Sequence, residues 1–95
     1  MILMLKIRYQ TSFKKDIKRI QKRGYDISLM KPVIDALAAQ QELDEKYHDH
    51  ALSGDWRRFR ECHITPDWLL IYRVDNGDLI LFLSRTGTHS DLFGL

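Results

Sequence analysis

The sequence lacks the features that would anchor a chain in a membrane or cross-link it covalently. It has one cysteine, Cys62, which cannot form an internal disulfide. A membrane helix needs roughly 20 apolar residues, and the longest apolar runs are far shorter. They are Met1–Leu5, Trp68–Tyr72 and Leu79–Leu83. No basic segment precedes the apolar start, as a signal peptide would require. We therefore expect a cytoplasmic protein without a membrane partner, folded as one domain over residues 1–95.

Acidic side chains are scarce in the first third of the chain, although the net charge is only +2. Residues 6 to 31 include nine lysines and arginines but only two aspartates, which leaves a local charge of +7. Such a stretch is typical of a surface that binds nucleic acid or an acidic protein. A solvated helix face without a partner is the alternative interpretation.

The N-terminal residues predict a strand followed by a helix. Apolar side chains alternate over residues 3 to 9, which indicates a strand with one buried face. Phe13, Ile17 and Ile20 then recur at helical spacing among basic residues. Gly24 suits the left-handed residue that commonly ends a helix. The basic residues should therefore lie on the solvent side of this helix.

A second helix is expected to begin at Asp26 or Ser28. Pro32 fits this helix only if it lies close to the first turn, because proline removes a backbone donor. The expected apolar stripe is Met30, Val33, Ile34 and Leu37. A short turn joins the two helices, so we predict an antiparallel helical hairpin.

The second half of the chain predicts an antiparallel sheet. Residues 40–54 suggest a loop, strands are expected at 56–64, 68–74 and 79–85, and a short tail follows. The middle strand is nearly all apolar, as expected of a central strand covered on both faces. Asn76-Gly77 is a strong signal for a two-residue hairpin. The predicted fold class is α+β: a mostly antiparallel sheet with an N-terminal strand and the helical hairpin packed on one face.

The first 47 residues contain no histidine, whereas the rest of the chain has four. Cleavage of a phosphodiester by the adjacent ribose 2′-OH needs a base, an acid and cations around the phosphate. Residues suited to these roles are His50, His63, Asp67, His89 and Arg85. Aromatic side chains such as Trp68 and Phe93 are suited to stack on the bases of single-stranded RNA. The alternative is that the histidines are ordinary surface residues and that Trp68 is packed in the core.

The pair His48-x-His50 also suggests a metal site, since two histidines at this spacing can bind zinc with help from elsewhere. A closed structural site would use further Cys or His pairs, and only one cysteine is present. We therefore expect no metal and no cofactor. A small metalloenzyme is kept as an alternative.

Three blocks of the sequence carry a family resemblance. They are Asp49–Gly54, Arg60–Tyr72 and Arg85–Phe93, in this order. Together they resemble the YafQ type of toxin in the RelE/ParE superfamily, and the likeness covers essentially the whole chain. The resemblance implies a RelE-like fold and a toxin of a type II toxin–antitoxin system. It also implies that the toxin cuts messenger RNA in the ribosomal A site without metal and is silenced by a small DNA-binding antitoxin of the DinJ/RelB kind.

The resemblance also implies roles for individual residues. The catalytic positions would be His50, His63, Asp67 and His89. The order of roles follows from position rather than from the resemblance. His50 lies on a predicted loop and His89 follows the last strand, so they can approach a substrate from opposite sides, and we expect His50 to be the base and His89 the acid. The RNA contacts would be Trp68, Arg85 and Phe93, and the expected ribosomal RNA contacts are Lys14, Lys15, Lys18, Lys22 and Arg23. No role is assigned to His48. The alternative from another functional class is a ParE-like inhibitor of DNA gyrase, a branch that lacks this set of histidines.

Overall fold

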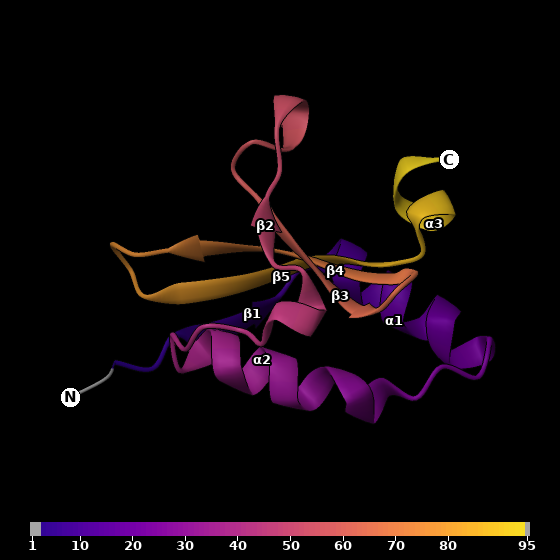
Figure 1. Ribbon diagram of the computed structural model, residues 1–95, viewed down its shortest axis with the longest axis horizontal. Helices are drawn as coiled ribbons and strands as arrows, with labels where there is room; N and C mark the ends of the chain where they lie inside the picture. Colours follow the sequence, from indigo (N-terminus) through magenta and orange to yellow (C-terminus); the bar gives the residue numbers. More distant parts are fainter. Residues whose placement is uncertain (1–2, 95) are drawn as a thin grey trace.

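A five-stranded sheet lies between two layers of helical segments in the computed structural model, which describes residues 3–94 (Figure 1). The strands are β1 Lys6–Tyr9, β2 His50–Ala51, β3 Arg60–Thr65, β4 Trp68–Asp75 and β5 Ile80–Gly87. They are arranged in the order β1-β5-β4-β3-β2. Only β1 runs parallel to its neighbour, β5. The predicted α+β class with a mostly antiparallel sheet is therefore confirmed.

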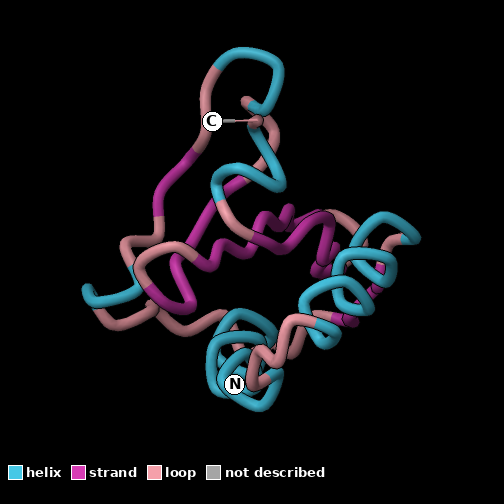
Figure 2. Tube along the Cα trace, turned by 90° about the vertical axis from the view of Figure 1, so that its right-hand side faces the viewer, coloured by secondary structure: helices cyan, strands magenta, loops and turns pink. Residues whose placement is uncertain are grey.

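Helices α1 (Thr11–Lys22) and α2 (Lys31–Ala38) lie on one side of the sheet, and the short α3 (His89–Phe93) lies on the other (Figure 1). Three short 3₁₀ turns complete the structure: η1 Ile27–Met30, η2 Glu45–Tyr47 and η3 Gly54–Trp56. The view along the sheet shows the two long helices as separate rods that both face its strands (Figure 2). In the described part of the chain, no helix has the length and apolar character needed to cross a membrane.

The core fills the space between the sheet and the two long helices. Phe13 and Ile20 from α1 pack with Val33 and Leu37 from α2 in one buried cluster. On β4, Leu70 and Tyr72 belong to the same cluster. The alternate β4 residues Leu69 and Ile71 are fully buried on the opposite face. The prediction of a central strand covered on both faces is confirmed.

Several element boundaries differ from the prediction. Strand β1 begins at Lys6, and the side chains of Leu3 and Met4 are 54% and 62% exposed. The second helix begins as η1, in which the Asp26 carboxylate accepts from the Ser28 amide. This 3₁₀ turn explains how Pro32 is tolerated, because it places the proline at the start of α2, where no intrahelical donor is lost.

The C-terminal half also shows differences. Strand β3 begins only at Arg60, because residues 54–56 form η3, and the expected tail after β5 is the helix α3. The hairpin between β4 and β5 is longer than two residues, since Asp75 pairs with Ile80. The Asp75 carboxylate accepts from the amides of Gly77 and Asp78. Leu79 then takes the left-handed conformation, with φ of 56°. The side chain of Asp75 therefore shapes this turn.

The outer edge of β5 is closed by side chains of α1. Strand β1 pairs with β5 only as far as Leu83, so the following backbone groups need other partners. The Ser12 hydroxyl donates to the Ser84 carbonyl at 2.7 Å. The Asp16 carboxylate accepts from the Thr86 amide at 3.1 Å. The sheet edge therefore depends on two polar residues of the first helix.

Asp16 is a buried carboxylate with several partners. Its side chain is 5% exposed and accepts from the Arg85 Nε at 2.6 Å and from Arg19 at 3.0 Å. The bond to Asp16 raises the pKa of Arg85 above its ordinary value, despite an opposing effect of burial. Because a buried charge is costly without partners, the two arginines and the Thr86 amide stabilise Asp16 in this position.

We predict that Asp16→Ala destabilises the protein by about 3–5 kcal/mol, because it removes the partner of a partly buried arginine and of a buried amide. The free energy of unfolding in urea is the measurement. Asp35→Ala is the matched control, since it removes an exposed pair with Lys31 on the surface of α2 and should change stability little. Equal stability of the two variants would contradict the structural role of Asp16.

Candidate active site

The rings of the other three histidines lie around that of His63. The centroid of its ring lies 5.7 Å from that of His48, 6.0 Å from that of His50 and 5.8 Å from that of His89. His48 precedes β2, His50 is the first residue of β2, His63 lies on β3, and His89 lies in the first turn of α3. The structure therefore brings together the three histidines predicted to be catalytic, and it adds His48, for which no role was predicted.

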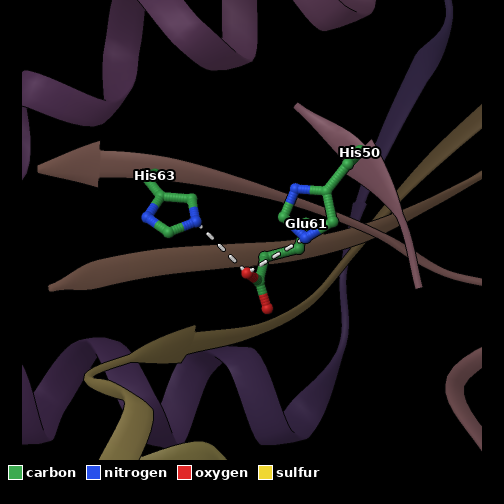
Figure 3. Close-up of side chains that lie close together, drawn as sticks. All are labelled: His50, Glu61 and His63. Atoms are coloured by element: carbon green, nitrogen blue, oxygen red, sulfur yellow. Dashed lines mark ion pairs between the residues drawn. The ribbon is translucent and has the colours of Figure 1, made fainter. Parts of the chain in front are cut away.

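A buried glutamate lies between two of these histidines. The β2–β3 ladder places His50 opposite Glu61, and His63 is two residues further along the same face of β3. The Glu61 Oε1 lies 3.5 Å from the His50 Nε2 and 3.3 Å from the His63 Nε2 (Figure 3). Glu61 is 5% exposed, whereas the His50 side chain is 48% exposed. Sequence analysis missed Glu61, and its period-two spacing from His63 was the available signal.

Backbone carbonyls define which ring nitrogen carries hydrogen in His50 and His63. The His50 Nδ1 lies 2.6 Å from the His48 carbonyl oxygen, and the His63 Nδ1 lies 3.3 Å from that of Pro66. A carbonyl can only accept, so each Nδ1 is the donor. In a neutral ring, the Nε2 atom that faces Glu61 then carries a lone pair. Each of these histidines is therefore arranged to take up a proton at Nε2.

His89 forms a dyad with Asp67. The Asp67 carboxylate accepts from the His89 Nδ1 at 2.6 Å and from its backbone amide at 3.2 Å. These bonds lower the pKa of Asp67 from its ordinary value, so this carboxyl group stays ionised near neutral pH. A carboxylate in this position orients an imidazole and stabilises its protonated form. The His89 Nε2 is therefore left to exchange a proton with a substrate.

Asp49 anchors the segment that carries His48 and His50. Its carboxylate accepts from the Tyr72 hydroxyl and from the Arg60 Nη2, at 2.5 Å and 3.1 Å. Burial, with a further contribution from Asp49, raises the pKa of Tyr72, so the hydroxyl stays protonated and donates. These contacts attach the segment that holds His48 and His50 to β3 and β4. Sequence analysis did not identify this role of Asp49.

Helix α3, which carries His89, is attached to α1 by an ion pair. The Asp91 carboxylate binds Arg23 through two bonds of 2.7 Å and 2.9 Å. It also accepts from the Thr88 amide, which completes a capping box at the start of α3. A Cβ atom on Gly87 would lie 2.9 Å from an Asp91 oxygen, so the strand must end in glycine here. The Arg23 guanidinium, predicted to contact RNA, is therefore engaged within the protein.

The prediction that Trp68 stacks on RNA bases is wrong. Trp68 is 2% exposed, and its indole donates to the Thr86 hydroxyl at 2.9 Å in the core. Strand β4 turns this side chain toward Tyr25, whose ring meets it edge-on at 5.2 Å. Phe93 is partly exposed and lies edge-on to Trp56 at 5.9 Å. An aromatic surface therefore exists near α3, but it consists of Trp56 and Phe93 rather than Trp68.

Arg85 and the basic residues of α1 differ in their surroundings. The Arg85 side chain is 27% exposed and two of its nitrogens donate to Asp16. A bulge in the β4–β5 pairing places Arg85 opposite Ile71 of β4. On its other side, Ile71 pairs with Glu61 of β3.

By contrast, four lysines of α1 are exposed and form no ion pair within the described residues: Lys14, Lys15, Lys18 and Lys22.

An open groove runs beside the histidine cluster. Its volume is about 1020 Å³, and His48, His50 and His63 line one side of it. Leu29 and Pro32 contribute apolar surface from η1 and the start of α2, and Leu29 is 46% exposed. A site of this size with apolar walls and a few polar groups is typical of ligand-binding pockets. The arrangement is suited to an organic anion such as a nucleotide within an RNA strand.

The RelE-like α+β fold and its close structural relatives define the class of the protein, a bacterial toxin of a type II toxin–antitoxin system. Residues 5–94 match the family described as "Bacterial toxin of type II toxin-antitoxin system, YafQ", and the chain belongs to this family. The chain is 40% identical over 89 residues to the mRNA interferase toxin YafQ of Escherichia coli K12, an alignment that covers 93% of this chain and 95% of that protein.

Two solved structures show how closely the fold is shared. The E. coli toxin in the DinJ–YafQ toxin–antitoxin complex superimposes with a TM-score of 0.86 at 38% identity, and the match covers 96% of this chain and 99% of that one. A metal-bound toxin from Helicobacter pylori superimposes with a TM-score of 0.89 at 46% identity, over 95% of this chain and 100% of that one. The RelE-like fold implied by the sequence resemblance is thus confirmed.

We predict that Trp68→Phe lowers the free energy of unfolding by about 1–3 kcal/mol, because the Thr86 hydroxyl loses its indole partner and a void is left. Binding of a short single-stranded RNA should be unchanged. Phe93→Ala, at the partly exposed aromatic pair, should show the opposite pattern. Urea unfolding measures stability, and fluorescence anisotropy with labelled RNA measures binding. If Trp68→Phe stays stable but loses RNA affinity, Trp68 does contact RNA.

Proposed function

We propose that this toxin is a ribosome-dependent endoribonuclease that cleaves messenger RNA in the A site without a metal ion in the chemical step. The observation that supports it most directly is the convergence of the His50 and His89 rings on that of His63, with Asp67 hydrogen-bonded to His89. His50 and His63 also line the groove beside this cluster. The similarity to an mRNA interferase of E. coli supports the same activity.

The proposed reaction needs one proton acceptor and one proton donor. The His50 Nε2 removes the proton from the ribose 2′-OH, and the 2′-oxygen attacks the adjacent phosphorus. The bond from phosphorus to the 5′-oxygen breaks, and that oxygen takes a proton from the His89 Nε2. The products are a cyclic 2′,3′-phosphate and a free 5′-hydroxyl, and the two histidines have exchanged protonation states.

The assignment of the two roles rests on the neighbours of each ring. Asp67 stabilises the protonated form of His89, which suits an acid. The His50 Nδ1–H is committed to a carbonyl, so its Nε2 lone pair is the free base. His63 lies between these rings and can bind the phosphate, and Arg85 offsets the charge that builds on the phosphoryl oxygens. Asp16 holds the Arg85 guanidinium in a fixed direction.

The ribosome and an antitoxin are the proposed partners. The four exposed lysines of α1 form a positive surface for ribosomal RNA phosphates. An E. coli relative forms a complex with DinJ, and we expect a small DNA-binding antitoxin of that kind here. Its toxin-binding segment should be acidic or amphipathic, because the toxin exposes basic α1 and large apolar side chains such as Met4 and Tyr9. Gyrase inhibition is the alternative function, and it would leave the histidine cluster unused.

We predict that His50→Ala and His89→Ala each slow single-turnover cleavage on programmed ribosomes by about 10² to 10⁴-fold, the usual loss for a general acid or base. Ribosome and antitoxin binding should be unchanged, because the side chains of His50 and His89 are 48% and 39% exposed and lie outside the core. His48→Ala is the matched control, and it should cleave at nearly the wild-type rate. Growth arrest with intact messages and accumulating gyrase–DNA adducts would favour the alternative function.

Charge reversal of the α1 lysines tests the ribosomal surface. A variant with glutamate at positions 14, 15, 18 and 22 should bind ribosomes more weakly, and its remaining affinity should depend less on salt, because fewer counterions are released. The measurement is the dissociation constant for ribosomes across a series of salt concentrations. A matched variant with Lys31→Glu, on α2, changes charge outside α1. If both variants bind ribosomes with the same affinity and the same salt dependence, the α1 lysines form a solvated surface without a role in ribosome binding.

A further inference from the structure

We propose that His50, Glu61 and His63 form a binding site for a divalent transition-metal ion of the Zn²⁺ class, and that occupancy of this site blocks RNA cleavage. The binding site is inferred from geometry alone, whereas the inhibition rests on the function proposed above. The metal would act as a reversible inhibitor of the toxin rather than as a part of its chemistry. Nε2 of each histidine and one carboxylate oxygen are the proposed ligands (Figure 3).

The spacing of the three donor groups fits a metal ion. Their ligand atoms all lie within 4.8 Å of one another, and Oε1 of Glu61 is 3.5 Å and 3.3 Å from the two Nε2 atoms. Zinc binds histidine nitrogen and carboxylate oxygen at about 2.0–2.2 Å, so neighbouring ligands of a tetrahedral ion lie roughly 3.3–3.5 Å apart. The two distances from Glu61 therefore already match those of a bound ion, and the two histidine nitrogens lie within 4.8 Å of each other.

Hydrogen bonds already orient the two imidazoles for this purpose. Both Nδ1 atoms donate to backbone carbonyls, of His48 and Pro66, so both Nε2 lone pairs face the Glu61 carboxylate. This is the usual arrangement of metal-binding histidines, in which the second nitrogen is held by a backbone carbonyl or carboxylate. A lone pair facing a carboxylate oxygen is unfavourable in the absence of a cation, because both groups are electron-rich.

The charge of Glu61 supports the same inference. Glu61 is 5% exposed, and within residues 3–94 its ion-pair partners are the two histidines alone. Other buried or half-buried carboxylates here are bound by arginines, as Asp16 is by Arg85 and Asp49 is by Arg60. A buried carboxylate is stable only with a compensating charge. Protons on the histidines can provide it, and so can one divalent cation.

The ligand set selects the class of metal. Two imidazoles and one carboxylate suit Zn²⁺, Cu²⁺ or Ni²⁺, whereas Mg²⁺ and Ca²⁺ prefer sites made of oxygen ligands. The His50 side chain is half-exposed and borders the groove, so a fourth position is open to water. Of the pair His48-x-His50, only His50 belongs to the donor set within 4.8 Å, and Glu61 and His63 complete it.

Metal binding and RNA cleavage would both require the lone pair on the His50 Nε2 atom. The Nε2 lone pair of His50, which accepts the 2′-OH proton in the proposed reaction, is the pair that would bind the ion. A bound ion would also stand between His50 and His63, where the phosphate is expected. The toxin should therefore be inactive with metal bound and recover when the metal is removed.

Binding is tested first, on the purified toxin without ribosomes. Titration calorimetry with ZnCl₂ should show one ion per chain for the wild type and for His89→Gln, which keeps all three ligands. Glu61→Gln should weaken binding by more than about 100-fold, since the loss of an outer-shell partner alone costs about 10- to 100-fold. MgCl₂ at the same concentration should produce no binding heat. Zinc affinity that is unchanged in Glu61→Gln would overturn the site.

A second ligand variant protects this test against misfolding. If Glu61→Gln unfolds, His50→Gln replaces a half-exposed side chain and should weaken zinc binding by the same order. Circular dichroism confirms that the fold is kept. A folded His50→Gln that retains wild-type zinc affinity would also overturn the site, whatever the state of the glutamate variant.

Inhibition is tested next, by single-turnover cleavage on programmed ribosomes. Stoichiometric Zn²⁺ should reduce the rate by at least 10-fold, and EDTA should restore it. Zinc bound at this site with no loss of rate would overturn the inhibitory role but leave the site. A toxin that cleaves only when zinc is added would overturn both the inhibition and the metal-free mechanism proposed above, and the calorimetry would still decide whether the site exists.

Discussion

The buried Asp16 carboxylate is the contact on which the rest of the structure depends. It closes the free edge of β5 through the Thr86 amide and fixes Arg85 on the same strand. Because Asp16 belongs to α1, it also sets the position of that helix against the sheet. The far end of α1 then holds α3 through the Arg23–Asp91 pair. Two ion pairs, Asp16–Arg85 and Arg23–Asp91, therefore connect α1 to β5 and to α3. Through them, the helix on one side of the sheet helps to fix His89 on the other side.

The candidate site has a simple chemical logic. Three histidines each commit Nδ1 to a fixed acceptor, which is a backbone carbonyl for His50 and His63 and a carboxylate for His89. Every Nε2 atom is thereby available, and the neighbouring carboxylates decide what it does. Glu61 is buried between two rings, while Asp67 is exposed beside the third. The same residue type thus acquires different properties from its surroundings.

Much of the fold could be predicted from the sequence, because the spacing of apolar residues indicates which side chains are buried in a helix or a strand. The alternation before α1, the stripe of α2 and the apolar run of β4 all correspond to elements of the structure. The predictions that were wrong depend on contacts between distant residues. Burial of Trp68 requires Tyr25 and Thr86, and the engagement of Arg23 requires Asp91. Likewise, Glu61 becomes notable only when the β2–β3 ladder brings His50 to it. Single-sequence patterns carry no information on such pairings.

The parallel pairing of β1 with β5 has a consequence for how the toxin is made. Lys6 pairs with Ile80, so the sheet can close only after a loop of more than 70 residues has been brought together. Closing such a loop costs chain entropy, and proteins dominated by distant contacts fold slowly. During synthesis, the ribosome that makes this protein holds an incomplete chain without the β1–β5 seam and without His89 beside His63. The order of its strands therefore keeps the histidine cluster unassembled until the complete chain has left the tunnel and folded.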